Sequence, residues 1–263
     1  MTVADALRGA SIDAREARIL LAAATGFSQA SVMAYPERPL PGDAEARYGE
    51  FVARRRRGEP VAYILGRKEF YGLELAVNPA VLIPRPETEL LIELALQRTF
   101  ASVVDLGTGS GAIAVALKRQ RPAARVLAVD SSAAALVVAK RNAVALGVDV
   151  EFHHGEWFGP FQGTRFDLIV TNPPYVAKGD PHLADLAFEP PGALLAGSDG
   201  LDAIRVIAAC APAHLAQGGT ILIEHGMGQD LAVRELLARQ GLEEVRTWPD
   251  LAGIPRVSGG RLK

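Results

Sequence analysis

A glycine-rich turn between a predicted strand and a predicted helix constrains the fold of this chain most strongly. The apolar run Val103-Val104-Asp105-Leu106 predicts a buried strand, and Gly107-Thr108-Gly109-Ser110-Gly111 follows it directly. The next stretch, residues 112–118, is apolar and helix-forming. Glycine permits a tight turn and lets backbone N–H groups approach a ligand closely. We therefore expect an α/β sheet with a ligand site at this turn.

The following predicted strand, near residues 126–130, ends in the carboxylate of Asp130. An acid roughly 20 residues beyond such glycines can accept hydrogen bonds from both hydroxyls of a ribose. A nicotinamide-dependent dehydrogenase would share these features, but its fingerprint has two residues between the second and third glycines. Asp105 before the turn would also repel a pyrophosphate. It would suit the sulfonium and ammonium of S-adenosylmethionine, which we therefore expect as the cofactor.

A second motif, Asn172-Pro173-Pro174-Tyr175, follows the β-forming run at residues 166–171. Two consecutive prolines cannot continue a sheet ladder, so the strand must end at Asn172. The carboxyl end of a parallel strand is where open α/β sheets bind their ligands. An Asn-Pro pair alone can merely cap a turn. The four residues together favour a binding site for a planar group.

The chemistry of these four residues suits a group that carries an –NH2. The amide oxygen of Asn172 and the carbonyl of Pro173 offer two acceptors for the two hydrogens, and Tyr175 adds an aromatic face. Such contacts would orient the nitrogen towards a methyl donor, which is catalysis by positioning and electrostatics. Neither a histidine nor a carboxylate lies beside Asn172 in the sequence, so we predict no general base.

Predicted strands and helices alternate from about Glu87 to the end of the chain, which indicates a mostly parallel sheet covered on both faces. Helices are expected between the strands, as at residues 133–146. The strands are predicted near residues 102–106, 126–130, 149–153, 166–171, 219–224, 243–247 and 256–262. Residues 87–263 are therefore expected to form the catalytic domain.

The first part of the chain, residues 1–68, is predicted to be helical, with one helix ending near Gly26 and another, capped by Asp43, spanning residues 44–57. The run Arg54-Arg55-Arg56-Arg57 lies in the last turn of that second helix. It could be a solvated run that complements the helix dipole, or a surface that binds a partner. Residues 69–86 are expected to link the two parts through a β-hairpin around Asn78-Pro79.

Composition excludes several classes of protein. A net charge of −2 argues against a broad surface for nucleic acids. The single cysteine excludes an intrachain disulfide framework and is consistent with a reducing compartment. The spacing of His and Cys predicts no metal site. We also expect neither a signal peptide nor a membrane span.

The two motifs together resemble the class I methyltransferases that modify planar nitrogens. More narrowly, nearly the whole chain resembles the peptide chain release factor glutamine N5-methyltransferases, the HemK/PrmC family. The further segments that carry this resemblance are residues 55–66, 69–73, 82–89, 188–190, 197–201 and 223–226. The segment Arg85-Pro86-Glu87-Thr88-Glu89 combined with Asn172-Pro173-Pro174-Tyr175 is quite specific to that family.

The resemblance implies a Rossmann-like methyltransferase domain with seven strands, the last antiparallel, and a small helical domain that docks the substrate. It also implies a cytoplasmic enzyme that methylates the glutamine of the Gly-Gly-Gln loop in class I release factors and leaves S-adenosylhomocysteine. Trp157 would face the adenine. Arg85 and Glu87 would contact the substrate, although Glu87 is equally suited to capping a helix. Cofactor contacts are expected from Asp105, Gly107, Thr108, Gly109, Ser110, Gly111, Asp130, Trp157 and Asn172.

Three alternatives are consistent with the same residues. One is a glutamine methyltransferase of a ribosomal protein. Another is an N6-adenine or N2-guanine nucleic-acid methyltransferase, because an exocyclic base amine suits the same acceptors. The near-neutral charge weakens this alternative, since nucleic-acid affinity depends on phosphate neutralisation. A non-catalytic cofactor-binding adaptor is the third, and the retention of Asn172 with the full glycine turn argues against it.

Four further side chains have simpler expected roles. Phe158 is predicted to pack in the core, as is the thiol of Cys210. We expect His225 to be a structural histidine with its hydrogen bonds satisfied. Glu189, which precedes two prolines, is expected to order the loop over the active site.

Overall fold

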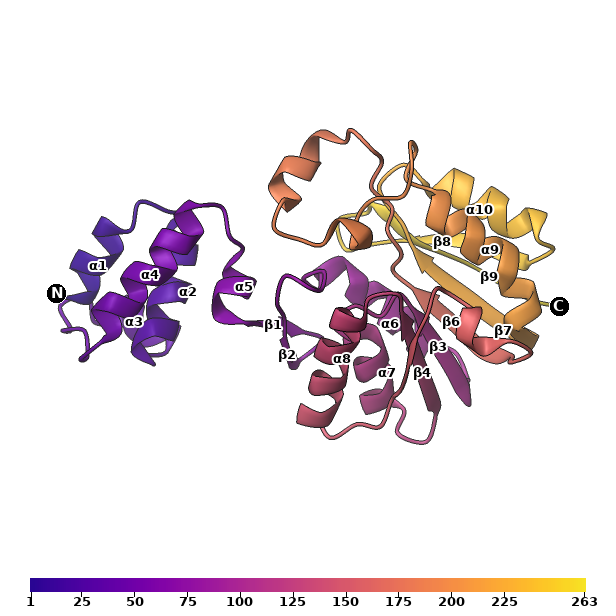
Figure 1. Cartoon of the computed structure of the whole chain (residues 1–263), viewed down its shortest axis with the longest axis horizontal. Coiled ribbons are helices and arrows are strands. Elements are labelled where there is room, and N and C mark those ends of the chain that lie inside the picture. Colours follow the sequence, from indigo (N-terminus) through magenta and orange to yellow (C-terminus); the bar gives the residue numbers. More distant parts are fainter. The chain divides into compact units, whose positions relative to one another are not determined.

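The computed structural model describes residues 1–263, except for the side chain of His182. The chain forms two compact units, Met1–Arg67 and Lys68–Lys263. The first unit is helical and the second is built on a seven-stranded sheet (Figure 1).

The helical unit has a small apolar core of its own, formed by residues such as Leu20, Leu21, Tyr48 and Ile64. As predicted, one of its helices ends at Gly26, which adopts the left-handed conformation with φ of 75° that glycine tolerates. Its helices are α1 (Val3–Gly9), α2 (Ala14–Thr25), α3 (Gln29–Ala34), α4 (Ala44–Arg56) and α5 (Val61–Leu65).

The arginine run at the end of α4 binds mainly within its own unit. Arg54 pairs with Glu59 at 2.5 Å, and Arg55 pairs with Glu16 at 2.6 Å. Arg56 donates to the backbone carbonyl of Ala10. These three residues therefore hold the helices of this unit together. They also lie in the last turn of α4, where their charge complements the helix dipole as one interpretation predicted. The partner-binding interpretation stays a prediction.

Asp43 precedes α4 as predicted, but the prediction that its side chain caps the helix is wrong. Among the described residues its side chain accepts no bond from the first turn of the helix; it pairs instead with the Arg47 guanidinium at 2.9 Å. The backbone of Asp43 has ψ of 0° rather than the extended value of most capping residues, which accounts for the missing capping bond.

The β-hairpin is present but lies earlier in the chain than predicted. Strands β1 (Arg67–Phe70) and β2 (Leu73–Ala76) are joined at Tyr71 and Gly72, which both have positive φ. Two such residues form the turn that matches the twist of a hairpin, which explains why the chain reverses there. Asn78 lies after the hairpin, where its Oδ1 accepts from the Ala80 N–H in a local turn.

The sheet of the second unit has the strand order β5-β4-β3-β6-β7-β9-β8. Strands β3 to β7 are parallel, and β9 pairs antiparallel with both β7 and β8. All seven strands overlap the predicted ones. Their bounds are β3 (Ser102–Leu106), β4 (Arg125–Asp130), β5 (Glu151–His154), β6 (Phe166–Thr171), β7 (Leu215–Glu224), β8 (Glu243–Pro249) and β9 (Pro255–Arg261).

Helices cover both faces of this sheet, as the alternation predicted (Figure 1). One apolar core lies under α6 and α7, and the other lies under α9 and α10 with Phe158 and Phe161. The helices are α6 (Glu89–Leu96), α7 (Ala112–Gln120), α8 (Ala133–Ala145), α9 (Asp202–His214) and α10 (Asp230–Arg239). This packing leaves the carboxyl edge of the parallel strands to the connecting loops, where the candidate site lies.

Candidate active site

The glycine turn after β3 requires its three glycines. Gly107, Gly109 and Gly111 have φ of 74°, 55° and 81°, values that other residues adopt only with strain. Gly111 also lies against α8, where a Cβ would come within 3.1 Å of the Ala139 side chain. The turn is anchored to the sheet because the N–H groups of Gly107 and Thr108 donate to the Val129 carbonyl.

Asp105 lies beneath this turn rather than in the wall of the cavity described below. Its carboxylate is fully buried and accepts hydrogen bonds from the Thr108 hydroxyl at 2.6 Å and the Ala114 N–H at 3.3 Å. Burial raises the pKa of Asp105 to about 7 against these two bonds, which lower it. Asp105 thus ties the turn to the first residues of α7, a role that the sequence did not predict.

Asp130 is placed at the end of β4, facing the glycine turn. One carboxylate oxygen accepts from the Gly109 N–H and the other from the Ser132 N–H, each at 2.8 Å. Each carboxylate oxygen has a second lone-pair direction, so both can still accept a hydroxyl. The two backbone bonds fix the orientation of the carboxylate.

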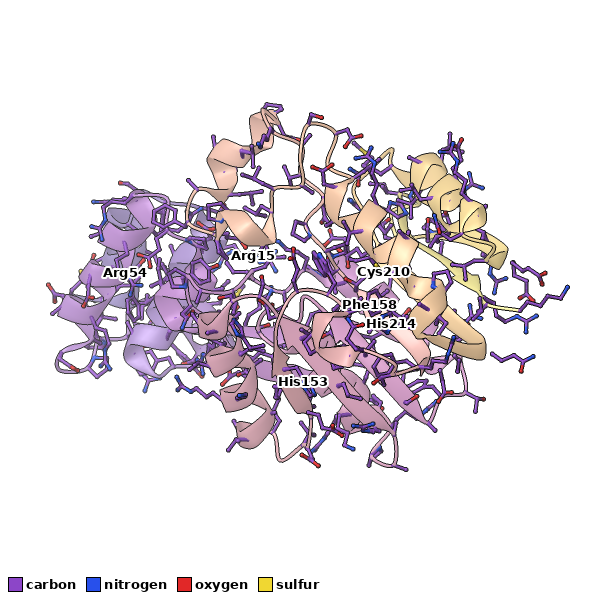
Figure 2. The ribbon with its side chains drawn as sticks, turned by 45° about the vertical axis from the view of Figure 1, so that its right-hand side comes forward. Arg15, Arg54, His153, Phe158, Cys210 and His214 are labelled. Carbon is purple, nitrogen blue, oxygen red and sulfur yellow. The ribbon has the colours of Figure 1, made fainter. Side chains whose placement is uncertain are left out.

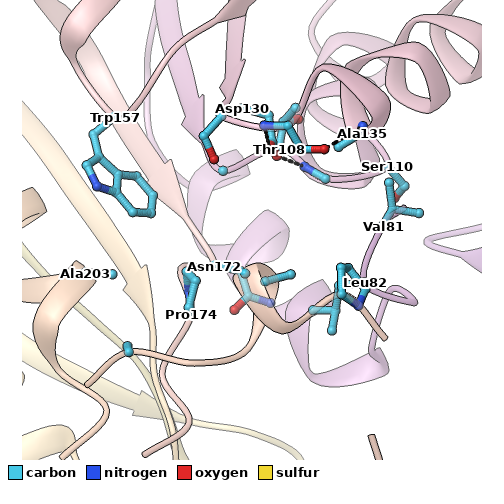
Figure 3. A pocket seen from close by; sticks show the side chains of 18 of the residues that line it. Val81, Leu82, Thr108, Ser110, Asp130, Ala135, Trp157, Asn172, Pro174 and Ala203 are labelled. Atoms are coloured by element: carbon cyan, nitrogen blue, oxygen red, sulfur yellow. Dashed lines mark hydrogen bonds between the residues drawn. The ribbon is translucent and has the colours of Figure 1, made fainter. Parts of the chain in front are cut away.

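A cavity of about 600 Å³ joins the ends of β3, β4 and β6. This volume lies within the roughly 300–1,000 Å³ of small-molecule sites. Trp157, Asp130 and Asn172 surround the same hollow (Figure 3). The predicted site residues in its wall are Arg85, Gly107, Thr108, Gly109, Ser110, Asp130, Trp157, Asn172 and Pro174.

The orientation of the Asn172 amide is set by a residue that the sequence did not single out for the site. Thr88 precedes α6, and its hydroxyl accepts a hydrogen bond from Asn172 Nδ2 at 3.1 Å. The opposite atom, Asn172 Oδ1, is buried and has no hydrogen-bond partner among the described residues. A buried acceptor without a donor is costly, so it marks a place where a ligand N–H would be stabilised.

Pro174 lines the cavity, but Pro173 and Tyr175 do not. Tyr175 packs into the core under α9 and α10, and burial raises its pKa to about 12. Its backbone carbonyl accepts from Gln229 Nε2 at 3.1 Å. The Tyr175 ring therefore supports the loop from beneath, whereas we had expected it to present a face to the ligand.

Glu224 is the second residue that the sequence did not single out. It ends β7, next to the strand that carries Asn172, and only 1% of it is exposed. Burial raises the pKa of Glu224 to about 7, while the nearby side chains of Thr88 and Asn172 and the charge of Arg256 lower it. Its Oε2 has no hydrogen-bond partner among the described residues. Its position as a polar residue at the end of a predicted parallel strand is the signal that could have identified it.

The loop over the cavity is tied down by Glu189, as predicted. One of its carboxylate oxygens accepts from the Ile83 N–H at 3.0 Å, and the other pairs with Arg85. Arg85 thereby links the cavity wall to this loop. Glu87 is exposed in the short helix Pro86–Thr88, outside the cavity wall.

Of the three remaining side chains, two behave as predicted and one does not. Phe158 is buried and stacks on the His214 ring, with centroids 4.4 Å apart (Figure 2). His225 is buried, and its ring nitrogens lie 3.0 Å from the Gly226 carbonyl and 2.9 Å from Ser258 Oγ. The prediction for Cys210 is wrong: its residue is exposed, because it lies on the face of α9 that points away from the sheet.

The geometry suits S-adenosylmethionine. Asp130 offers oriented acceptors for a ribose, Trp157 offers a ring for a base, and the buried Oδ1 of Asn172 offers an acceptor for the group to be methylated. Among the described residues, no group of three or more His, Cys, Asp or Glu side chains is arranged to hold a metal ion. Nor does any helix in the described part of the chain have the length and apolar character to cross a membrane.

Solved structures share this architecture. A 16S rRNA methyltransferase (RsmC) from T. thermophilus, in complex with AdoMet and guanosine, superposes with a TM-score of 0.58 and 22% identity, over 75% of this chain and 50% of its own. A methyltransferase from Pyrococcus furiosus gives 0.57 at 18% identity, over 80% and 96%. The fold and the site together define an S-adenosylmethionine-dependent methyltransferase of class I.

Sequence comparison identifies the family. The methyltransferase small domain matches residues 86–189, and the PrmC N-terminal domain matches residues 2–66. The release factor glutamine methyltransferase of Burkholderia pseudomallei (strain K96243) is 50% identical, over 99% of this chain and 96% of its own. That of Xylella fastidiosa (strain Temecula1 / ATCC 700964) is also 50% identical, over 95% and 94%. The chain belongs to the release factor glutamine methyltransferase family.

Proposed function

We propose that this protein transfers a methyl group to the side-chain nitrogen N5 of the glutamine in the Gly-Gly-Gln loop of class I release factors. The observation that carries the proposal is the unpaired, buried Oδ1 of Asn172 in the wall of the cavity. A glutamine side chain ends in a planar –NH2 group that can donate to it. We expect such an enzyme to act in the cytoplasm, where release factors act.

A glutamine amide is a poor nucleophile because its nitrogen lone pair is delocalised into the carbonyl. Asn172 Oδ1, in the cavity wall, would accept one hydrogen of the –NH2. Pro173 does not line the cavity itself but lies between Asn172 and Pro174, which both do, and we propose its carbonyl as the acceptor for the other hydrogen. Two acceptors would hold the nitrogen in one orientation. Both acceptors also favour the positive charge that develops on the nitrogen as the new bond forms, and one of the two hydrogens leaves the nitrogen afterwards as a proton. Positioning and electrostatics of this kind contribute several kcal/mol to lowering a barrier.

The cofactor would lie along the ends of β3 and β4. S-adenosylmethionine supplies an electrophilic methyl group when bound. Asp130 would bind its ribose hydroxyls and Trp157 its adenine, while the backbone of residues 107–111 borders the rest. Asp105 would act from beneath by holding the turn, since its carboxylate does not line the cavity.

Two related activities suit the same pair of acceptors. A glutamine of a ribosomal protein carries the same group, and an exocyclic amine of adenine or guanine has the same two hydrogens. The net charge of −2 offers little attraction for a polyanion, so we place nucleic acids last and propose no direct nucleic-acid binding.

A competition experiment tests the proposal. Purified release factor, ribosomal protein and duplex DNA are offered together with S-adenosylmethionine, and the methylated residue is mapped by mass spectrometry. We expect methyl transfer to the Gly-Gly-Gln glutamine of the release factor. Methylation confined to DNA or to another protein would overturn the proposed substrate.

The helical unit is proposed to dock the release factor. A glutamine in a short loop offers little contact area, and small areas give weak binding. Met33 and Tyr35, at the end of α3, are 68% and 54% exposed, so this unit presents apolar surface that a partner can cover.

Removal of residues 1–66 tests this docking role, because the cut leaves β1 intact. We expect the remaining unit to bind cofactor and to methylate a short Gly-Gly-Gln peptide slowly, with efficient methylation of intact release factor lost. A full-length Tyr35→Ser variant should weaken the reaction with release factor and spare the peptide. The docking role is wrong if the truncated, soluble protein methylates whole release factor at the full rate.

A further inference from the structure

Glu224 and Asn172 are brought together by the register of two parallel strands. In that register Thr171 pairs with Ile223, so the residues that follow, Asn172 and Glu224, leave the sheet side by side. Thr88, from the segment before α6, lies against both of them. Thr88 and Asn172 line the cavity, whereas Glu224 lies behind the wall.

Asn172, Thr88 and Glu224 can form hydrogen bonds in only one arrangement. Asn172 Nδ2 donates to the Thr88 hydroxyl at 3.1 Å, and the side chains of both residues lie close enough to the Glu224 carboxylate to lower its pKa. Glu224 Oε2 is buried and has no other partner among the described residues, so it is open to a donor from either side chain. An ionised carboxylate can only accept, and a hydroxyl has a single hydrogen to donate. If Thr88 gives that hydrogen to Glu224, its oxygen can only accept from Asn172. Both neighbours therefore require the Nδ2 side of the amide.

We propose that Glu224 is a positioning residue for methyl transfer: its ionised carboxylate orients the Asn172 amide, directly and through Thr88, so that Oδ1 faces the acceptor nitrogen. This proposal rests on the function proposed above in one respect: the group to be methylated must carry an –NH2. A flipped amide would place Oδ1 against two acceptors and would turn its own N–H groups towards those of the substrate.

The charge on Glu224 is what selects the orientation. A protonated Glu224 can donate to Asn172 Oδ1, so both orientations of the amide become acceptable. Since its pKa is raised by burial to about 7, the ionised form gains population as the pH rises through neutrality. The other charged or titratable groups around it are Arg256 from β9, Glu87 from the turn before α6, and Tyr175, which itself faces Arg85.

The test compares Glu224→Gln with the wild-type protein, using intact release factor and S-adenosylmethionine across pH 5.5–9. For the wild type we expect kcat to rise with pH, with a midpoint near 7, and to level off at higher pH once Glu224 is ionised. For Glu224→Gln we expect kcat to fall at least about tenfold at pH 8, which is less than the roughly hundredfold cost of losing a direct contact, because Glu224 acts through Asn172. The rise near pH 7 should disappear, and cofactor affinity should stay within about threefold. Glu235→Gln, on the exposed surface of α10, controls for the change in charge.

A spectroscopic measurement gives an independent readout. The 15N side-chain amide signals of Asn172, assigned by their absence in Asn172→Ala, should shift with pH near 7 in the wild type and stay constant in Glu224→Gln. Should Glu224→Gln fail to fold, Thr88→Val removes the intermediate hydroxyl and should lose the same pH dependence, while Thr88→Ser should retain it.

Two outcomes would overturn the proposal: wild-type kcat with an unchanged pH profile in folded Glu224→Gln, or an unchanged profile in Thr88→Val. Failure of the proposed function would look different. In that case wild-type protein would methylate another –NH2 acceptor instead of the release factor, and the same variants would be compared on that acceptor.

Discussion

The carboxyl edge of the sheet has two halves. The cofactor half contains the glycine turn at residues 107–111 and Asp130, and the acceptor half contains Thr88, Asn172 and Glu224. A buried carboxylate lies behind each half, but the two carboxylates hold different groups in place. Under the cofactor half, the buried carboxylate of Asp105 accepts from the Thr108 hydroxyl and a backbone N–H. Behind the acceptor half, the buried carboxylate of Glu224 lies close to Thr88 and to the side chain of Asn172, which both lower its pKa. The first carboxylate fixes a stretch of backbone, and the second fixes a single amide group. The halves should therefore fail separately when mutated.

The largest expected effect comes from the acceptor half. Asn172→Ala should lower turnover by at least roughly a hundredfold, the scale for losing one preorganised polar contact. Affinity for S-adenosylmethionine should stay within about tenfold, because the cofactor half is untouched. Rapid-quench kinetics with saturating cofactor, together with calorimetry, separate the two quantities. Near-wild-type turnover would show that the two halves are not divided in this way.

The buried carboxylate of the cofactor half should make stability depend on pH. Its pKa is raised from 3.8 to about 7, so the folded state favours the protonated form. That contribution is complete below the lower value and is lost as the pH rises towards 7. Asp105→Asn lacks this loss. Between pH 5 and 8 its free energy of unfolding should therefore increase relative to that of the wild type by about 2–3 kcal/mol, because each pH unit between the two pKa values contributes about 1.4 kcal/mol.

Urea unfolding of the cofactor-free proteins at both pH values measures this difference. The raised pKa of Glu224 acts in the same direction, but it is present in both proteins and cancels in the comparison. Parallel pH profiles for wild type and Asp105→Asn would contradict the assignment.

Removing the Asp130 carboxylate, which faces the cavity, should weaken cofactor binding more than it destabilises the fold. Asp130→Ala should reduce the binding free energy of S-adenosylmethionine by about 1–3 kcal/mol, the cost of leaving buried donors unpaired. Turnover at saturating cofactor should change far less than in Asn172→Ala. Calorimetry is the direct measurement, and unchanged affinity would move the ribose site elsewhere.

The smallest effect concerns the glycine turn. Both Gly109→Ala and Gly111→Ala place a side chain at positive φ, which costs about 1–2 kcal/mol. Only at Gly111 would the new Cβ crowd a neighbour, Ala139, whereas at Gly109 no described atom lies within 4 Å. Gly111→Ala should therefore be the less stable variant in thermal unfolding. Equal stability would mean that α8 yields to the added methyl group.

The two halves also differ in how much of their structure could be predicted from the sequence. The cofactor half consists largely of one continuous stretch followed by Asp130. The strand at residues 102–106 was therefore predicted with the correct bounds, and the strand that ends at Asp130 begins one residue earlier than predicted. The acceptor half depends on Thr88 and Asn172, which are 84 residues apart, and on Glu224. Only the folded sheet brings these together. Local pattern showed that Asn172 ends a strand but not what orients it.

The wrong predictions have a related cause. Residue type and position were read correctly for Asp105 and Tyr175, but the direction of each side chain was not. Both point into the core, beneath the loops that they support. The alternation of a strand indicates which residues share a face, but it does not show which polar side chain a loop will cover.

The placement of Trp157 gives the protein a built-in optical reporter. The chain has two tryptophans, and Trp157 alone lies in the cavity wall among the described residues. Trp248 lies on β8, with the Arg246 guanidinium 4.8 Å from its ring. Trp248→Phe should thus leave a single indole whose fluorescence responds to ligands. Entry of S-adenosylhomocysteine could then be followed in real time, without a label and without turnover.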